Sequence, residues 1–102
     1  MPLVLFTNDT NIMDNELKIE LEKILEYLKR SNDSIYSYST VEEIKNTIYE
    51  ITAQIDNNKK VDKQKIKYLI APTGSLQEIS IDNGWGEKFV TIASKIDEKI
   101  AV

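Results

Sequence analysis

Apolar residues recur every three or four positions along most of this chain, which is the spacing of one face of an α-helix. The first such stretch predicts a helix over residues 15–30, and Asp14 can cap its start. Its apolar face consists of Leu17, Leu21, Ile24, Leu25 and Leu28. Residues 1–14 are expected to precede this helix as an N-terminal arm.

A second stretch predicts a helix over residues 41–56. Its apolar positions form a narrow stripe of the coiled-coil type, namely Val41, Ile44, Ile48, Ile51 and Ile55. Two capping boxes compete for its start, because Ser39 is followed three residues later by Glu42, and Thr40 by Glu43. The stripe can serve as an intramolecular core or as the contact of a homodimer, and the sequence leaves both open.

Two further helices are expected over residues 62–71 and 86–101. Asp62 can cap the former, and Pro72 ends it because the residue before a proline disfavours helical dihedrals. The apolar face of the latter consists of Phe89, Ala93, Ile96 and Ile100.

Residues 72–85 between these helices are expected to form a turn-rich segment. Within it, residues 77–81 are ambiguous, because Ile79-Ser80-Ile81 alternates in polarity as a strand does. Residues 3–6 are also a short apolar run. A minor two-stranded β element made of 3–6 and 77–81 is therefore an open alternative.

These patterns predict a mainly α fold, a small four-helix bundle-like domain, because short connections make neighbouring helices antiparallel. The chain has 102 residues, which suits a single domain. It is 41% hydrophobic with only three Gly and two Pro, and this composition indicates a globular protein rather than a disordered one.

The chain contains neither Cys nor His. It therefore lacks the commonest general base, the commonest metal ligand and the thiolate nucleophile. No phosphate-binding loop, dinucleotide motif or calcium loop is present either. We expect a protein without catalytic activity, cofactor or metal.

The net charge is −4, and this argues against nucleic-acid binding. Residues 1–58 have a net charge of −6 and residues 59–102 one of +2, a polarity that can steer a charged partner. A solubilising surface is the simpler explanation of the same charges. The apolar run 3–6 is too short for a signal peptide or a membrane span, so we expect a cytoplasmic protein without membrane contacts.

The C-terminal half carries a resemblance to known proteins. Residues 70–79, Ile-Ala-Pro-Thr-Gly-Ser-Leu-Gln-Glu-Ile, lead to Asn83-Gly84-Trp85-Gly86 and then to a helix. This layout resembles small helical bacterial immunity proteins of polymorphic toxin and contact-dependent growth inhibition systems. It covers residues 15–100, and its specific part is 72–86. The resemblance implies a protein that binds a cognate toxin domain, and it assigns no individual residue.

An acidic inhibitor could associate rapidly with a basic nuclease domain and block its active site or substrate groove. The residues that we expect to bind such a partner are acidic or aromatic: Glu16, Glu20, Glu22, Glu26, Tyr36, Tyr38, Asp82 and Trp85. Trp85 can equally plug one end of the bundle, with Gly84 at positive φ and Gly86 opening the last helix. The competing function is a helical adaptor or a homodimeric interaction module.

Overall fold

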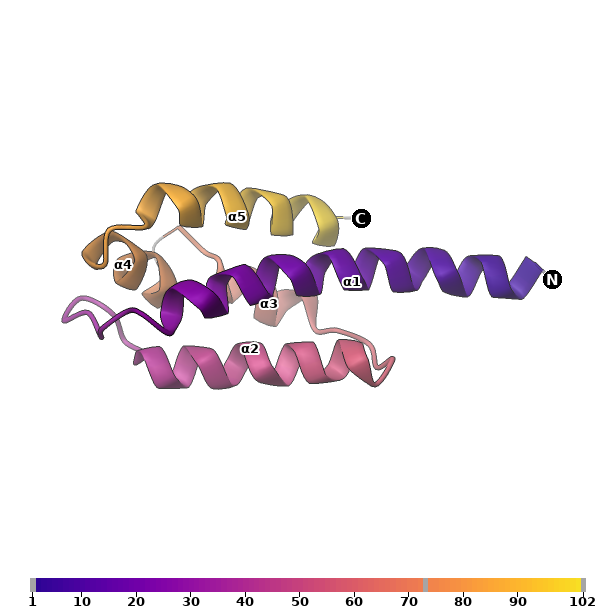
Figure 1. Ribbon diagram of the computed structural model, residues 1–102, viewed down its shortest axis with the longest axis horizontal. Helices are drawn as coiled ribbons and strands as arrows, with labels where there is room; N and C mark the ends of the chain where they lie inside the picture. Colours follow the sequence, from indigo (N-terminus) through magenta and orange to yellow (C-terminus); the bar gives the residue numbers. More distant parts are fainter. Residues whose placement is uncertain (1, 73, 102) are drawn as a thin grey trace.

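The helices form a bundle in which one long helix packs between two others. The computed structural model describes residues 2–72 and 74–101, with the side chains of residues 2–13 excepted. The first helix, α1 (Pro2–Leu28), lies between α2 (Val41–Asp56) and α5 (Gly86–Ile100) and contacts both. Figure 1 shows that α1 runs antiparallel to both of them. The mainly α fold class is therefore confirmed.

Two short helices complete the described fold: α3 (Lys63–Leu69) and α4 (Ser75–Asp82). In the view of Figure 1, α3 lies behind α1 and α4 lies next to the start of α5. α4 packs against α5, and both α3 and α4 contribute buried side chains to the core. The described chain thus has five helices, one more than the four that the sequence predicts.

The structure corrects one expectation about the backbone and decides one alternative that the sequence left open. Residues 72–85 are not turn-rich throughout, because Ser75–Asp82 form α4. Residues 3–6 lie inside α1 and residues 77–81 inside α4, so the minor β element does not form. In α4, Ile79 is fully buried whereas Ile81 is 54% exposed. A strand would place these two side chains on the same face, so only a helix gives this division.

The N-terminal arm is also a helix rather than an irregular segment. No Gly or Pro interrupts residues 3–28, and Pro2 is tolerated because it lies in the first helical turn. The first half of α1 therefore continues past the ends of the other helices (Figure 1), and the molecule is 52 Å long and 21 Å wide.

The start of α2 resolves the competition between the two capping boxes. Thr40 is the N-cap: its hydroxyl accepts the Glu43 amide at 3.1 Å, while the Glu43 carboxylate accepts the Thr40 amide at 2.9 Å. Asp62 caps α3 as expected, and its carboxylate accepts the amides of Gln64 and Lys65. Both caps satisfy amides that have no partner within the helix.

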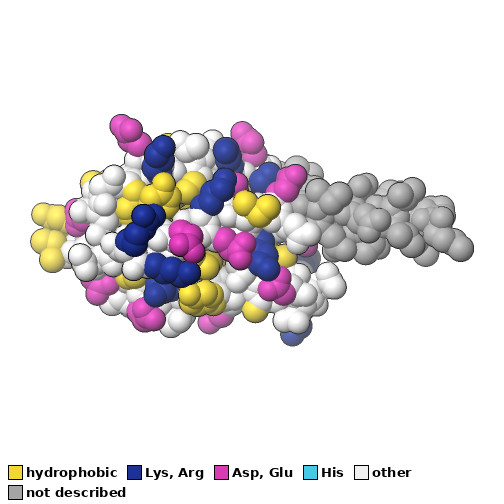
Figure 2. Space-filling view, in the orientation of Figure 1, with side chains coloured by type: hydrophobic (Ala, Val, Ile, Leu, Met, Phe, Trp, Pro, Cys, Tyr) yellow, Lys and Arg dark blue, Asp and Glu magenta, His cyan; other side chains and the backbone are white. Residues whose placement is uncertain are grey.

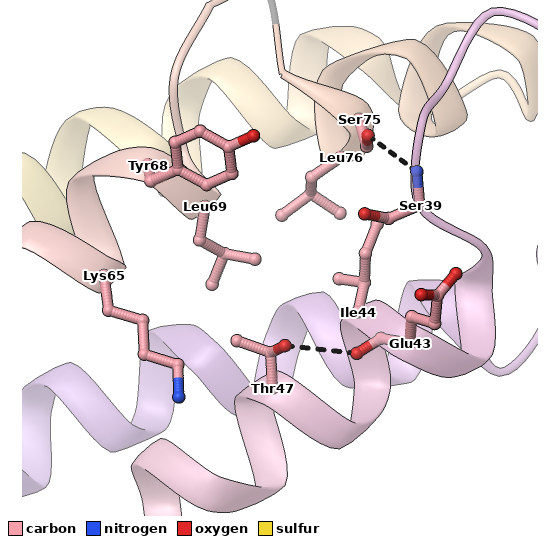
Figure 3. A pocket seen from close by; sticks show the side chains of 9 residues that line it. All are labelled: Ser39, Glu43, Ile44, Thr47, Lys65, Tyr68, Leu69, Ser75 and Leu76. Carbon is pink, nitrogen blue, oxygen red and sulfur yellow. Dashed lines mark hydrogen bonds between the residues drawn. The ribbon is translucent and has the colours of Figure 1, made fainter.

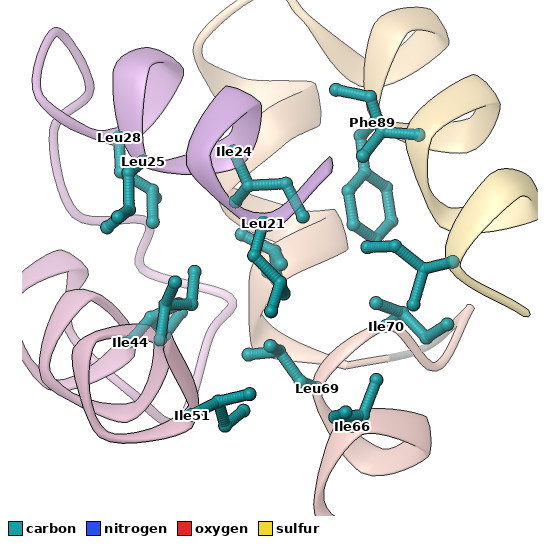
Figure 4. Packing of buried hydrophobic residues seen from close by; sticks show 14 of the residues in the cluster. Leu21, Ile24, Leu25, Leu28, Ile44, Ile51, Ile66, Leu69, Ile70 and Phe89 are labelled. Atoms are coloured by element: carbon teal, nitrogen blue, oxygen red, sulfur yellow. The ribbon is translucent and has the colours of Figure 1, made fainter. Parts of the chain in front are cut away.

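The core runs along the axis of the bundle and draws on all five helices (Figure 4). The following apolar side chains are less than 2% exposed: Leu21, Ile24, Leu28, Ile48, Ile51, Ile66, Leu76, Ile79, Phe89 and Ile96. The stripe on α2 is part of this core, since Ile44, Ile48, Ile51 and Ile55 are all buried within the chain. It is therefore not available as the seam of a homodimer.

Candidate protein-binding surface

The connection between α1 and α2 crosses one end of the bundle. We call residues 31–40 of this connection the tyrosine loop. Its sequence, Ser-Asn-Asp-Ser-Ile-Tyr-Ser-Tyr-Ser-Thr, places apolar side chains among short polar ones. Short polar side chains bond to nearby backbone groups and so favour irregular structure over helix. The loop therefore has no helix of its own, and its conformation depends on what its polar groups contact.

The C-terminal end of α4 holds the first half of this loop. Asn83 accepts the Asn32 amide at 2.9 Å through its side-chain oxygen and donates back to the Asn32 carbonyl at 2.8 Å. The Ser34 hydroxyl, which is buried, donates to the carboxylate of Asp82. Asp82, one of the predicted binding residues, therefore lies at the C-terminal end of α4. Its carboxylate helps to position the loop.

The N-terminal end of α4 holds the second half. The hydroxyl oxygen of Ser75 accepts the amides of both Tyr38 and Ser39, each at 3.0 Å. The carboxylate of Asp33 accepts the Val41 amide at 2.7 Å and so ties the loop to the first residue of α2. Hydrogen bonds at both ends of α4 thus fix the backbone of the loop.

The loop presents three large apolar side chains to solvent. Ile35 is 89% exposed, Tyr36 69% and Tyr38 fully exposed. Hydrophobic atoms project at the end of the molecule where Figure 1 places the α1–α2 connection and the turn before α5 (Figure 2). Tyrosines are enriched at protein interfaces, and a loop held in one conformation loses little entropy when it binds. These are the properties of a preorganised binding surface.

Acidic residues are concentrated in the segments that form and support this loop. Residues 31–43 and 74–86, which the hydrogen bonds bring together, contain no Lys or Arg. They contain five acids: Asp33, Glu42, Glu43, Glu78 and Asp82. The lysine-rich stretch 59–67 belongs to the loop before α3 and to α3 itself. These two segments are therefore acidic, while Arg30 immediately before the loop and Lys45, which pairs with Glu42, are the basic side chains next to them in the chain.

Trp85 lies inside the protein rather than on this surface. It is 5% exposed, its ring stacks on Tyr27 with centroids 4.8 Å apart, and its Nε1 donates to the Ser31 hydroxyl at 2.9 Å. Gly84 has φ of 81° and Gly86 opens α5. The sequence left two roles open for Trp85, contact with a partner and packing at the end of the bundle. The structure supports the second role, because Trp85 is buried there.

The four glutamates of α1 do not form a bare acidic face. Glu16 accepts from Lys99 and Glu26 from Lys29, at 2.9 and 3.1 Å. Glu20 is buried and accepts from Lys23 at 2.9 Å, while Glu22 is exposed. The hydrogen bond to Glu16 raises the pKa of Lys99 above its usual value. Acidic and basic side chains also alternate over the face shown in Figure 2, which is typical of a solvated charged surface.

Sequence reasoning overlooked Ile35 and the polar residues that position the loop. Ile35 could have been found as an apolar residue inside a polar connection. Ser34, Ser75 and Asn83 had no local signal, because their hydrogen bonds reach residues 36 to 51 positions away.

Among the described residues, no group of acidic side chains is arranged to hold a metal ion. No helix in the described part of the chain has the length and apolar character needed to cross a membrane. Comparisons with protein-family models, curated proteins and solved structures found no match to this chain.

Proposed function

We propose that this protein is an immunity protein, which binds a cognate cytotoxic domain and blocks its active site or substrate groove. The observation that carries the proposal is the tyrosine loop, which holds Ile35, Tyr36 and Tyr38 in solvent on a backbone fixed by α4. An inhibitor needs a rigid surface with a few aromatic anchors, and it needs no catalytic group of its own.

The charge around the loop favours a nuclease as the target. A nuclease holds phosphate groups in a basic groove. The five acids near the loop, without any neighbouring Lys or Arg in the same two segments, would attract that groove and accelerate association. In this proposal the contact surface is the loop end of the bundle, and not the face of α1 that the sequence suggested.

The test is a binding and growth assay with the C-terminal domain that is encoded directly upstream. We expect that this domain alone stops growth, and that co-expression of the present protein restores it. The double variant Tyr36→Ala/Tyr38→Ala should weaken binding by more than about 30-fold, because the loss of even one central aromatic anchor costs about 2 kcal/mol or more. Isothermal titration calorimetry measures this change.

The matched control is Tyr49→Ala, which removes a partly exposed tyrosine from α2. It should leave affinity unchanged. If a demonstrably toxic upstream domain does not bind the protein, the proposal is overturned. Tight binding to a harmless neighbour would instead favour the helical adaptor.

A further inference from the structure

A cavity of about 240 Å³ opens beside the tyrosine loop, between α2, α3 and the start of α4 (Figure 3). Ser39 and Ser75 belong to its wall, and the same two residues are joined by the hydrogen bond that anchors the loop. The cavity is thus continuous with the proposed contact surface. It is smaller than the roughly 300–1,000 Å³ typical of small-molecule sites, so a single side chain suits it better than a cofactor does.

The most deeply buried side chains of the cavity wall are apolar. Ile44, Leu69 and Leu76 line it, and each is less than 9% exposed. Tyr68 also lines it but is 82% exposed, so much of the ring is open to solvent at the rim. An occupant would therefore contact aliphatic side chains deep in the cavity and an aromatic ring near the entrance.

Two charged side chains flank the cavity, on opposite sides (Figure 3). Lys65 is already paired, since its Nζ lies 2.7 Å from the carboxylate of Glu50. Glu43 accepts one hydrogen bond, from the Thr40 amide, whereas a carboxylate has about four acceptor sites. Because Glu50 offsets the charge of Lys65, these three side chains together have a net negative charge, which favours a cationic occupant.

We infer that this cavity accepts an arginine side chain of the partner protein. Its methylene groups would cover Leu69 and Leu76, and its guanidinium would donate to Glu43. Arginine suits the site better than lysine, because a planar guanidinium can donate two parallel hydrogen bonds to a carboxylate. This inference rests on the proposed function, and it names a chemical requirement for the partner.

The first experiment uses the free protein and needs no partner. N-acetyl-arginine amide is titrated while the methyl signals of Leu69 and Leu76 are followed by NMR. We expect saturable shifts with a millimolar dissociation constant, and weaker ones with the lysine analogue. The uncharged citrulline analogue has almost the same shape and should give none. Equal responses to arginine and citrulline, or no response to arginine, would overturn the inference.

Glu43→Gln is the informative variant, because glutamine can still accept the Thr40 amide and keep the cap of α2. It should weaken arginine binding, and the affinity for the partner, by about tenfold. The control is Glu42→Gln, which removes the same charge from the next position, outside the cavity. Similar losses from both variants would indicate a general charge effect and refute the arginine site.

The two proposals fail in different ways. If the partner binds but arginine does not, only the cavity inference is wrong. If arginine binds and a demonstrably toxic neighbour does not, the proposed function is wrong.

Discussion

At the scale of single residues, Trp85 shows how one side chain joins distant parts of the chain. Its ring stacks on Tyr27 of α1 and meets Phe89 of α5 edge-on, with centroids 6.2 Å apart. Its Nε1 donates to Ser31, whose hydroxyl in turn donates to the Tyr27 carbonyl at 2.8 Å. A buried indole with its N–H satisfied therefore connects the end of α1 to the start of α5.

Trp85→Phe is expected to lower the free energy of unfolding by about 2 kcal/mol, because it removes the hydrogen bond and part of the stacked area. Urea denaturation followed by circular dichroism measures this change. Tyr68→Phe is the control, since Tyr68 is exposed, and it should have almost no effect. Equal stability of Trp85→Phe and the wild type would contradict the role of Trp85 as a plug.

At the scale of elements, α4 organises the candidate site although it has only eight residues. Its first residue, Ser75, accepts two amides of the tyrosine loop, while Asp82 and Asn83 at its other end hold Ser34 and Asn32. Leu76 and Ile79 anchor the helix itself in the core. The backbone of the loop is thus tied to a helix that is itself anchored in the core.

Ser75→Ala should loosen the loop without unfolding the bundle. The amides of Tyr38 and Ser39 lose their acceptor, while alanine slightly favours the helix. We expect faster hydrogen exchange at these two amides, a lower affinity for the partner and nearly unchanged global stability. Ser94→Ala, on the exposed face of α5, should change none of these. Unchanged exchange at both amides would show that Ser75 does not hold the loop.

At the scale of the whole molecule, lysine pairs join the helices across the surface. Lys18 of α1 pairs with Asp56 of α2 at 2.6 Å, and Lys99 of α5 pairs with Glu16 of α1 at 2.9 Å. Hydrogen bonds to these carboxylates are the main cause that raises the pKa of each lysine above 10.5, the usual value. Such exposed pairs contribute little to the stability of the fold. The raised pKa values of their lysines nevertheless determine how that contribution changes with pH.

A lysine whose pKa is higher in the folded state stabilises the fold fully at any pH below its unfolded pKa. The contribution is lost as the pH rises through the folded pKa. Stability from these two pairs should thus be constant around neutral pH and should decrease above pH 10.5. The variant Lys18→Gln/Lys99→Gln should have a lower free energy of unfolding than the wild type at pH 7. This difference in the free energy of unfolding should shrink above pH 10.5. A difference that grows there instead would reverse the assigned sign.

Most helices could be located from patterns in the sequence, because the signals for helices are local. The apolar period and the capping residues of α2 act within a few positions of each other, and its bounds are those predicted. The start of α1 and the whole of α4 were not predicted. Ile79-Ser80-Ile81 in α4 fits a strand as well as a helix, and only packing against α5 decides between them. The exposure of Tyr36 and Tyr38 also follows from their polar surroundings.

Which candidate residues can reach a partner depends on the tertiary structure. Glu20 and Trp85 are buried, whereas Asp82 is exposed and also accepts from Ser34. The rigidity of the tyrosine loop depends on bonds between residues 37 and 51 positions apart, Tyr38 with Ser75 and Asn32 with Asn83. Such pairs form only after the core has placed α4 beside the loop, so no pattern within a few residues can indicate them.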